Sequence, residues 1–448
     1  MSDQSNRPSS ASRRDFLKTT AVAAGAVAAT QLSLPAVHAA GSDFIKVGLI
    51  GCGGRGNGAA VNVLEAAKGV TIHALGDVFQ FQVDGTRHRL EHFVKNEKSG
   101  KTARELGNTV DVEGRCFSGL DAYKQVIDSG ANYIILATTP GFRPIHLQAA
   151  VAAGKNIFTE KPVAVDGPGI RKVLEAHKEA EKKGLHIVAG TQRRHQLAYL
   201  ETMKRIHDGA IGDLVGGQFY WMQNLLWEHI SDLPKHPEIK GDVAKQIFNW
   251  YNYTWLCGDH IVEQHVHNLD VMNWAFGTHP QSAVGMGYRT RTDPKFGHIY
   301  DFFAIDYKFP NGMHTLSMCR QISNCKSEVG EYLVGTKGVC HTADRSAYNI
   351  NGQDVFTRKE WRQHRDPYVQ EHMDLIESIR SDKPINELKR VAESTLTAIM
   401  GRMSAYTGQE VSWERALSSK EDTMPKDLTL EMSKPVAPVA IPGKTPLI

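Results

Sequence analysis

Two segments of the chain carry side chains that could perform acid/base chemistry. Glu160 and Lys161 stand at the end of an apolar, β-branched run in NIFTEKPVAV, and Glu263 and His267 stand in GDHIVEQHVHNLD. A lysine held at a strand end can donate hydrogen bonds to a hydroxyl group and can stabilise an oxyanion as charge develops. A carboxylate one helical turn before a histidine can orient the imidazole and stabilise its protonated form. The alternative is a plain helix-surface pair, which is worth only ~0.3–0.5 kcal/mol.

The segment that carries the histidine, Gly258–Trp274, is predicted to be one helix. At i, i+4, i+7 spacing one stripe is apolar and is expected to face the core; it holds Val262, Val266 and Leu269. The other stripe can line a pocket, and it holds Glu263, His267, Asp270 and Trp274.

The histidines of this segment also suggest a metal site, which the helical spacing disfavours. His265 and His267 would point to nearly opposite sides, and His260 and His267 would be about 10.5 Å apart along the axis. We therefore predict no metal. A site made by Glu263, His267 and a distant third ligand remains the alternative.

A glycine-rich loop lies near the start of the chain, in FIKVGLIGCGGRG. A strand over residues 45–50 is followed by Gly51, Gly53 and Gly56 and by a helix predicted from about Asn57 to Ala67. Such glycines permit a tight turn, close approach of the backbone to a pyrophosphate, and close packing of helix on strand. We assign these glycines and Arg55 to a dinucleotide site.

The strand that follows, VTIHALGD, ends at Asp77. A carboxylate at this point of the pattern can bind both hydroxyls of a ribose and repels a 2′-phosphate, so NAD is favoured over NADP. The alternative is an ordinary loop acid.

Strands and helices continue to alternate, which predicts a doubly wound parallel sheet. Thr138, Thr139 and Pro140 end the strand NYIILATTP, and Glu160 and Lys161 end the next one. Carboxyl ends of parallel strands share the edge at which such sheets bind ligands. We therefore add these five residues to the predicted site.

Together, VGLIGCGGRG, the ATTP strand end, HLQAAVAAGKNIFTEKPVA and the histidine segment resemble the Gfo/Idh/MocA oxidoreductase family over about residues 44 to 410. The resemblance implies an α/β protein: a Rossmann domain followed by an α/β domain with a large open, mostly antiparallel sheet. It also implies a nicotinamide cofactor, sugar or cyclitol substrates, and contact of Lys161 with both. The family usually has Asp four residues before its catalytic histidine, where this chain has Glu263 before His267; HNLD supplies the usual ending at Asp270.

The family also carries substrate-facing residues near Gln192, Arg193 and His195, which makes these residues and Asp270 substrate candidates. For the adjacent pair Arg193 and Arg194 the alternative is one solvated side chain and one interdomain ion pair. The aromatic run over residues 248–256, FNWYNYTWL, predicts either a platform for the apolar face of a sugar or plain core.

The first 40 residues are predicted to be a twin-arginine export signal, cut after Ala39 or Ala40. SRRDFLK precedes an Ala/Val-rich run and AVHAA. An amphipathic helix is the alternative, but the run shows no polar face. The further predicted domains are a Rossmann domain over 41–190, a substrate domain over 191–415, and an extended arm over 416–448 that either wraps a partner subunit or is mobile.

Composition excludes several kinds of partner. The net charge is only +3, which argues against nucleic acid or an anionic membrane as partner. No run after the signal approaches the ~18 apolar residues of a membrane span. The six cysteines form no CxxC, and a chain exported already folded does not depend on disulfides, although a Cys319–Cys325 bridge remains an alternative.

These observations predict an exported oxidoreductase that holds NAD tightly, because the periplasm offers no useful nucleotide pool. It would act on a hydroxyl of a sugar, glycoside or cyclitol and pass the hydride to a second acceptor. One alternative is an NAD-dependent glycoside hydrolase that oxidises its substrate transiently, and another is a non-catalytic sugar-binding protein. By resemblance, a homo-oligomer is expected.

Overall fold

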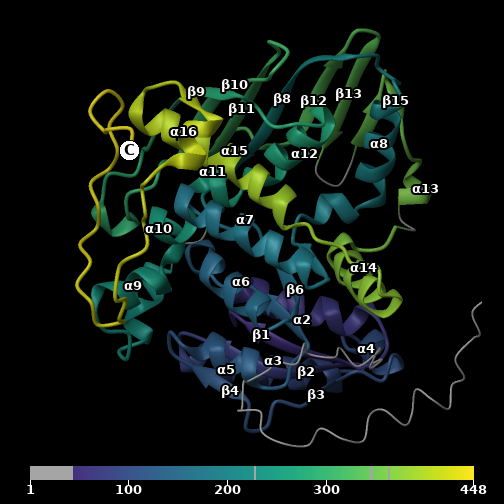
Figure 1. Ribbon diagram of the computed structural model, residues 1–448, viewed down its shortest axis with the longest axis vertical. Helices are drawn as coiled ribbons and strands as arrows, with labels where there is room; N and C mark the ends of the chain where they lie inside the picture. The colour runs from purple at the N-terminus through teal and green to yellow at the C-terminus, as the bar shows by residue number, and fades with distance from the viewer. Residues whose placement is uncertain (1–43, 227–228, 344–346, 362–363) are drawn as a thin grey trace, which may run out of the picture. The chain divides into compact units, whose positions relative to one another are not determined.

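The computed structural model describes residues 44–226, 229–343, 347–361 and 364–448. The predicted export signal lies outside them. Two β-sheets with their helices make up the described chain (Figure 1). The predicted fold class is confirmed: a parallel sheet in the N-terminal half is followed by a mostly antiparallel sheet.

The first sheet is parallel in every described pairing, in the order β3-β2-β1-β5-β6-β7 with β4 beside β2. Its strands are β1 (Ile45–Ile50), β2 (Val70–Asp77), β3 (Thr109–Val110), β4 (Cys116–Ser118), β5 (Tyr133–Leu136), β6 (Asn156–Thr159) and β7 (Ile187–Ala189). The central strands are apolar and buried, as expected of a sheet with helices on both faces. Its helices are α2 (Gly54–Ala66), α3 (Gln80–Lys95), α4 (Lys101–Glu105), α5 (Ala122–Asp128), α6 (Arg143–Ala152) and α7 (Gly167–Lys182).

Helix α2 begins three residues earlier than predicted, directly after the turn. Gly51 makes the turn with φ +101°, and Gly53 is the N-cap. A Cβ atom at Gly56 would overlap the carbonyl oxygen of Gly51, so Gly56 allows α2 to pack against the end of β1.

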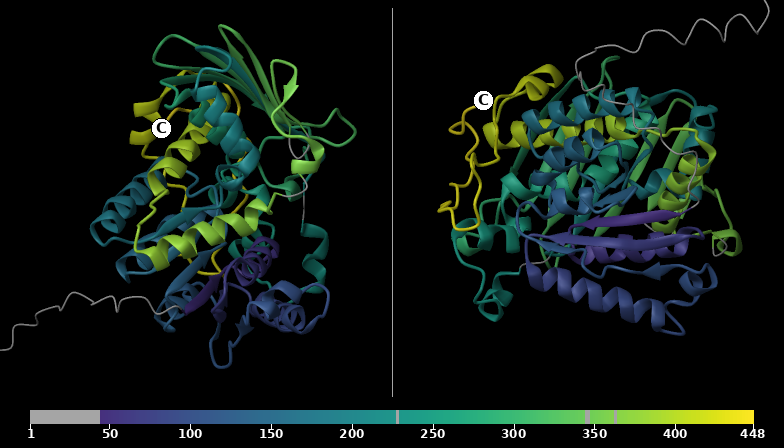
Figure 2. Two further views of the ribbon diagram at one scale, coloured as in Figure 1. Left: turned by 90° about the vertical axis from the view of Figure 1, so that its right-hand side faces the viewer. Right: turned by 60° about the horizontal axis from the view of Figure 1, so that its bottom comes forward.

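The second sheet has nine strands among the described residues, in the order β15-β14-β13-β12-β8-β11-β10-β9-β16. They are β8 (Leu214–Gln223), β9 (Ser282–Tyr288), β10 (Phe302–Lys308), β11 (His314–Gln321), β12 (Glu328–Gly335), β13 (Gly338–Ala343), β14 (Ala347–Ile350), β15 (Gln353–Asp354) and β16 (Val411–Ser412). Only β8 and β11 pair in parallel among these described strands. Helices cover one face, and the other is open (Figure 2).

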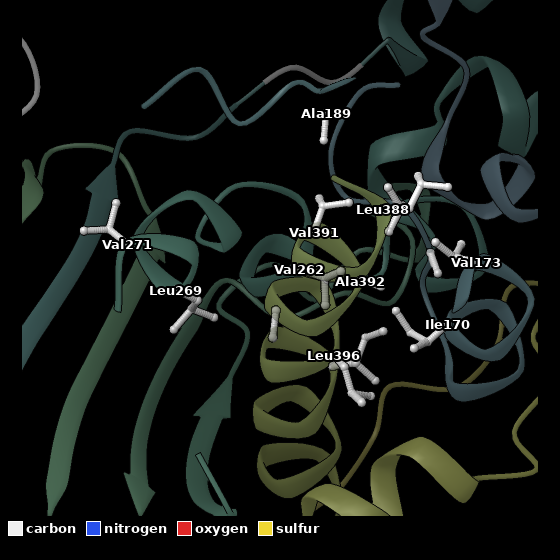
Figure 3. Close-up of a cluster of buried hydrophobic side chains, with 14 of the residues drawn as sticks. Ile170, Val173, Ala189, Val262, Leu269, Val271, Leu388, Val391, Ala392 and Leu396 are labelled. Carbon is white, nitrogen blue, oxygen red and sulfur yellow. The ribbon is translucent and has the colours of Figure 1, made fainter. Parts of the chain in front are cut away.

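The helices of this half are α8 (Leu197–His207), α9 (Asp242–Phe248), α10 (Thr254–Cys257), α11 (His260–Glu263), α12 (Val266–Phe276), α13 (Arg358–Trp361), α14 (Pro367–Ser381), α15 (Leu388–Thr407) and α16 (Trp413–Ser418). Helix α15 is buried on all sides along most of its length, since every residue from Ser394 to Ala405 is buried. Its Val391 and Leu396 pack in one cluster with Ile170 of α7, Val262 of α11 and Leu269 of α12 (Figure 3). This helix therefore joins the two halves of the chain.

Helix α14 returns to the first sheet, although it follows the second sheet in the sequence. Val369, Leu375 and Ile376 of α14 lie in the same core cluster as Ile45, Val47 and Leu49 of β1. The hydroxyl of Tyr133 on β5 lies 2.7 Å from Nδ1 of His372. Residues 367–381 thus complete the N-terminal half.

The predicted single helix over Gly258–Trp274 is wrong, because the structure divides it into α11 and α12. The chain turns at Gln264 and His265, where the His267 N–H donates to the Gln264 carbonyl at 3.4 Å instead of to Glu263. The Glu263 carbonyl is therefore available to another donor.

The C-terminal arm packs against earlier parts of the same chain, among them α9 (Figure 1). Backbone N–H groups of Val243 and Ala244 donate to the carbonyls of Met432 and Leu430, and Tyr300 donates its hydroxyl hydrogen to the Ala440 carbonyl. All six cysteines are free, including Cys319 and Cys325. Within the described ranges, no helix combines the length and apolarity that crossing a membrane requires.

Replacing Gly56 with Ala is expected to lower the free energy of unfolding by about 1–3 kcal/mol, because the new methyl group must push α2 away from β1. Gly54→Ala is the matched control, since a Cβ atom there, at the first residue of α2, meets no described atom within 4 Å. Denaturant unfolding of both variants measures the difference. Equal stability of the two variants would contradict the packing role of Gly56.

Candidate functional site

A cavity of about 1000 Å³ lies at the carboxyl ends of the first sheet's strands. Residues directly after β1, β2, β5, β6 and β7 line it, and residues from α9, the α11–α12 turn and the start of α14 complete its wall. The predicted site residues that line it are Gly51, Gly53, Arg55, Asp77, Thr138, Thr139, Glu160, Lys161, Gln192, Arg193, Glu263 and His267. The predicted residues outside the lining are Gly56, Pro140, His195 and Asp270.

The glycine-rich turn fits a dinucleotide. A Cβ atom at Gly51 would lie 2.5 Å from backbone atoms of Ala137 and Thr138, whereas at Gly53 and Gly54 no described atom lies within 4 Å of such a position. The N-terminus of α2 is thus open toward the cavity, where its free N–H groups can donate hydrogen bonds to phosphate oxygens.

Asp77 is fixed beside this turn. Its carboxylate accepts hydrogen bonds from the backbone N–H groups of Cys52 at 2.7 Å and Phe79 at 3.0 Å. Burial raises the pKa of Asp77, and these hydrogen bonds oppose the rise. The carboxylate is held at the cavity wall as an acceptor for hydroxyl groups.

Arg55 also lines the cavity, but acidic groups already surround its guanidinium. Its Nε lies 2.5 Å from Glu160 and its Nη2 lies 3.6 Å from Glu371, and it stacks over the ring of Tyr368 at 4.8 Å. Burial strongly raises the pKa of Glu371, whose carboxylate oxygens have no hydrogen-bond partner in the described part of the chain. Arg55 therefore fixes Glu160 next to Lys161 in addition to bordering the nucleotide site.

Lys161 joins the end of β6 to the α11–α12 turn. Its ammonium group donates to the Glu263 carbonyl at 2.5 Å and lies 3.2 Å from the Glu263 carboxylate. The two side chains are 11% and 7% exposed. Burial raises the pKa of Glu263, and the charges of Lys161 and Arg143 oppose that rise. A desolvated cation in this position acts strongly on a nearby oxygen.

His267 faces the cavity as a neutral base, which differs from the sequence-based expectation. Its ring stacks on Trp221 of β8 with centroids 5.4 Å apart and an interplanar angle of 20°. Burial lowers the pKa of His267 well below the usual value, and the charges of Lys161 and Arg193 lower it further. A neutral imidazole can accept a proton.

The expected pairing of Glu263 with His267 does not form. The Glu263 carboxylate bonds instead with Lys161 and with the side-chain amide of Gln264. The pairing required one continuous helix, and the break between α11 and α12 removes the one-turn relation.

Gln192 and Arg193 both reach the cavity. The Gln192 side-chain oxygen is buried and has no partner among the described residues, which leaves it available as an acceptor. Arg193 forms a buried ion pair with Glu331 at 2.5 Å and stacks over Trp221 at 5.7 Å. The positive charge of Arg193 is therefore paired with a carboxylate on β12 of the second sheet.

Asp270 and His195, which were predicted as substrate residues, lie outside the cavity lining. Asp270 is buried and bonds with Arg194 at 2.8 Å, Arg390 at 3.2 Å and the Ser394 hydroxyl at 2.8 Å. Asp270 thus belongs to a structural ion-pair network. Both adjacent arginines make ion pairs: the Arg193 side chain is buried, and the Arg194 side chain is partly exposed.

His195 makes a similar structural contact, with its Nδ1 2.5 Å from Asp374 and its Nε2 3.7 Å from Glu387. Gly56 and Pro140 lie close behind the cavity: Gly56 packs against Gly51, and Pro140 begins a short 3₁₀ turn over Pro140–Phe142.

Histidines near the site have protein partners. Nδ1 of His260 lies 2.9 Å from the Tyr251 hydroxyl, and Nε2 of His265 lies 2.7 Å from the Ser317 hydroxyl. No group of three metal-ligating side chains occurs among the residues that the structure describes.

Sequence reasoning missed part of the cavity wall, which is formed by Arg143, Trp221, His364, Arg365, Asp366, Pro367 and Tyr368. Asp366 caps α14 through the Tyr368 N–H, a start signal that DPY displays in the sequence. That signal predicts a helix but not its return to the first sheet. Of the aromatic run, Phe248 and Trp250 line the cavity, whereas Tyr251, Tyr253 and Trp255 are buried core.

Two family profiles match this chain. The first, "Oxidoreductase family, NAD-binding Rossmann fold", matches residues 45–188, and the second, "Oxidoreductase family, C-terminal alpha/beta domain", matches residues 236–411. The chain belongs to the Gfo/Idh/MocA oxidoreductase family.

Similarity to individual proteins is lower. An inositol 2-dehydrogenase of Gluconacetobacter diazotrophicus is 25% identical over 38% of this chain and 44% of its own length. The match thus spans less than half of that relative. An inositol 2-dehydrogenase of Rubrobacter xylanophilus is 22% identical over 66% of this chain and 71% of its own. A glycosyl hydrolase family 109 protein of Shewanella pealeana is 24% identical over 48% of this chain and 47% of its own length.

Solved structures share the fold. The scyllo-inositol dehydrogenase of Lactobacillus casei with bound NAD(H) and scyllo-inositol has a TM-score of 0.61 at 16% identity, covering 83% of this chain and 99% of that one. The aldose-aldose oxidoreductase of Caulobacter crescentus complexed with glycerol also has a TM-score of 0.61 at 16% identity, covering 82% of this chain and 99% of that one.

The His195 network predicts a defined pH dependence of stability. Burial alone would lower the pKa of His195, but the hydrogen bond to Asp374 and the charge of the nearby Glu387 raise it to about 9. The unfolded value is ~6.5, so the stabilisation is complete below pH ~6.5 and is lost as pH rises through about 9.

We expect the difference in unfolding free energy between wild type and His195→Asn to be about 3 kcal/mol larger at pH 6 than at pH 10. Denaturant titrations at both pH values measure it. His314→Asn is the control, because the His314–Asp306 contact of 2.8 Å is half exposed and contributes little. A difference that does not change with pH would contradict the assignment.

Proposed function

We propose that this protein is an NAD-dependent oxidoreductase that oxidises a hydroxyl of a sugar, glycoside or cyclitol. The observation that carries the proposal is that the buried His267 and the Lys161 ammonium line the same cavity as the glycine turn and Asp77. The family and the names of the inositol 2-dehydrogenase relatives support the substrate class.

The residues of the first sheet fit the cofactor. Gly51, Gly53 and the N-terminus of α2 would hold the pyrophosphate, and Asp77 would hold ribose hydroxyls while disfavouring a 2′-phosphate. When bound, NAD supplies the hydride acceptor.

His267 and Lys161 then act on one substrate oxygen. His267 accepts the hydroxyl proton, and Lys161 donates a hydrogen bond to that oxygen and stabilises the negative charge that develops on it. Glu263 holds the ammonium group in place through its carbonyl and carboxylate. The Gln192 oxygen is available to accept a hydrogen bond from another substrate hydroxyl.

Export and cofactor retention complete the proposal. SRRDFLK supports twin-arginine transport of a protein that folds around NAD in the cytosol and works in the periplasm. A retained cofactor must be reoxidised in place, so a second carbonyl compound would collect the hydride.

A second candidate is redox-assisted glycoside hydrolysis. The similarity to a glycosyl hydrolase family 109 protein favours it. Release of the aglycone without net oxidation would distinguish hydrolysis from dehydrogenation.

We also propose that the open sheet face binds another copy of this chain. On β8, β9 and β11 this face exposes large apolar side chains: Val215, Val284, Met286, Tyr288 and Leu316. Contiguous apolar surface of this kind marks interaction sites.

Removing the acid/base residues is expected to lower kcat strongly without unfolding the protein. His267→Gln should lower it by about 10²–10⁴-fold and Lys161→Met by about 10²–10³-fold. The assay follows NADH formation during single-turnover oxidation of sugars and cyclitols by the NAD-loaded protein, with His314→Ala as control on the far sheet.

Retention of full activity in both variants would contradict the assigned roles. If the wild type binds NAD and these substrates but never reduces NAD, the proposed oxidation is wrong. The protein would then be a non-catalytic sugar-binding protein.

A further inference from the structure

The C-terminal segment 419–434 is bonded to the outer wall of the cavity, helix α9. Asp242, at the start of α9, accepts hydrogen bonds from the Ser433 hydroxyl and the Lys434 N–H, both at 3.1 Å. Gln246 donates to the Lys434 carbonyl at 2.5 Å and accepts from the Trp255 indole at 2.7 Å. With the two backbone bonds to Leu430 and Met432, the segment is bonded to α9 from Asp242 to Gln246.

Helix α9 needs this support. It has only seven residues, and a helix this short is not stable in water by itself. Its Val243 and Ile247 are buried in a small cluster that includes Phe142 and Trp255. The arm covers that cluster with four apolar side chains, Met424, Leu428, Leu430 and Met432.

The supported helix closes the nucleotide end of the cavity. Ile247 and Phe248 line the cavity, and the Phe248 ring lies edge-on to Phe79 with centroids 6.2 Å apart. Phe79 in turn donates its N–H to Asp77, the residue placed to hold the ribose. The wall that α9 provides is thus adjacent to the carboxylate that selects NAD.

The other end of the segment is fixed near the catalytic lysine. Asp166 accepts from the Thr423 N–H at 2.9 Å and from its hydroxyl at 2.6 Å, and the same carboxylate caps α7 through the Gly169 N–H at 2.8 Å. The chain between Lys161 and Asp166 is buried. The segment therefore bridges the strand end that carries Lys161 and the wall over Asp77.

We propose that residues 419–434 are a positioning element that clamps α9 over the nucleotide end of the cavity and slows dissociation of the cofactor. The inference rests on the proposed function in one respect, that this cavity holds NAD. It gives the proposed retention of NAD a structural cause within a single chain.

The test uses the full-length protein and the double variant Asp242→Ala/Gln246→Glu, which removes the side-chain bonds to the arm, keeps an acceptor for the Trp255 indole and changes none of the assigned cofactor residues. Exchange of bound NAD for isotope-labelled NAD gives the dissociation rate. We expect the double variant to release NAD at least about tenfold faster, with kcat unchanged at saturating NAD.

Thr445→Ala is the matched control, because it removes a hydrogen bond within the arm, to the Ile441 N–H, away from α9. This variant should keep the wild-type exchange rate. Faster cleavage of segment 419–434 by a protease checks that the double variant has released the arm.

A released arm with an unchanged NAD exchange rate would overturn the clamp and leave the proposed function intact. A wild type that neither contains nor binds NAD would overturn the proposed function itself. Hydrogen exchange on wild type provides a test without any variant: α9 and residues 419–434 should gain protection together when NAD binds, and no gain in either would overturn the clamp.

Discussion

The contact between Lys161 and Glu263 is the constraint on which the site depends. It joins the end of a strand in the first sheet to the turn between α11 and α12, and both side chains are almost fully buried. A buried ammonium group is costly unless it is paired and hydrogen-bonded. The break between the two helices meets this requirement by freeing the Glu263 carbonyl for Lys161.

The same contact determines the chemistry available to His267. Lys161 and Arg193 place positive charge near the imidazole, and the carboxylates of Glu263 and Glu331 pair with them. Burial and this charge lower the pKa of His267, which favours the neutral imidazole. Stacking on Trp221 fixes the orientation of the ring at the cavity wall.

The N-terminal half was predictable because its signals are local. The glycine turn, Asp77 and the EKP strand end each follow directly from a strand, and parallel strands bring their carboxyl ends to one edge. The cavity lining accordingly includes most of the predicted cofactor residues and Lys161.

The remaining features depend on contacts between distant parts of the chain. Asp270 was predicted to face substrate, but its partners Arg390 and Ser394 lie on α15, more than one hundred residues later. Helical spacing could not predict the turn at Gln264 either, because the buried Lys161 compensates for the broken helical hydrogen bonding there. The arm's docking on α9 likewise depends on packing that no short motif displays.

Retention of NAD during export can be measured directly from the nucleotide content of the exported protein. The mature protein would be purified from the periplasm without added nucleotide, denatured, and the released nucleotides quantified by mass spectrometry. The account predicts close to one NAD or NADH per chain. An exported, folded protein that releases none would contradict the claim that the chain leaves the cytosol with its cofactor already in the cavity.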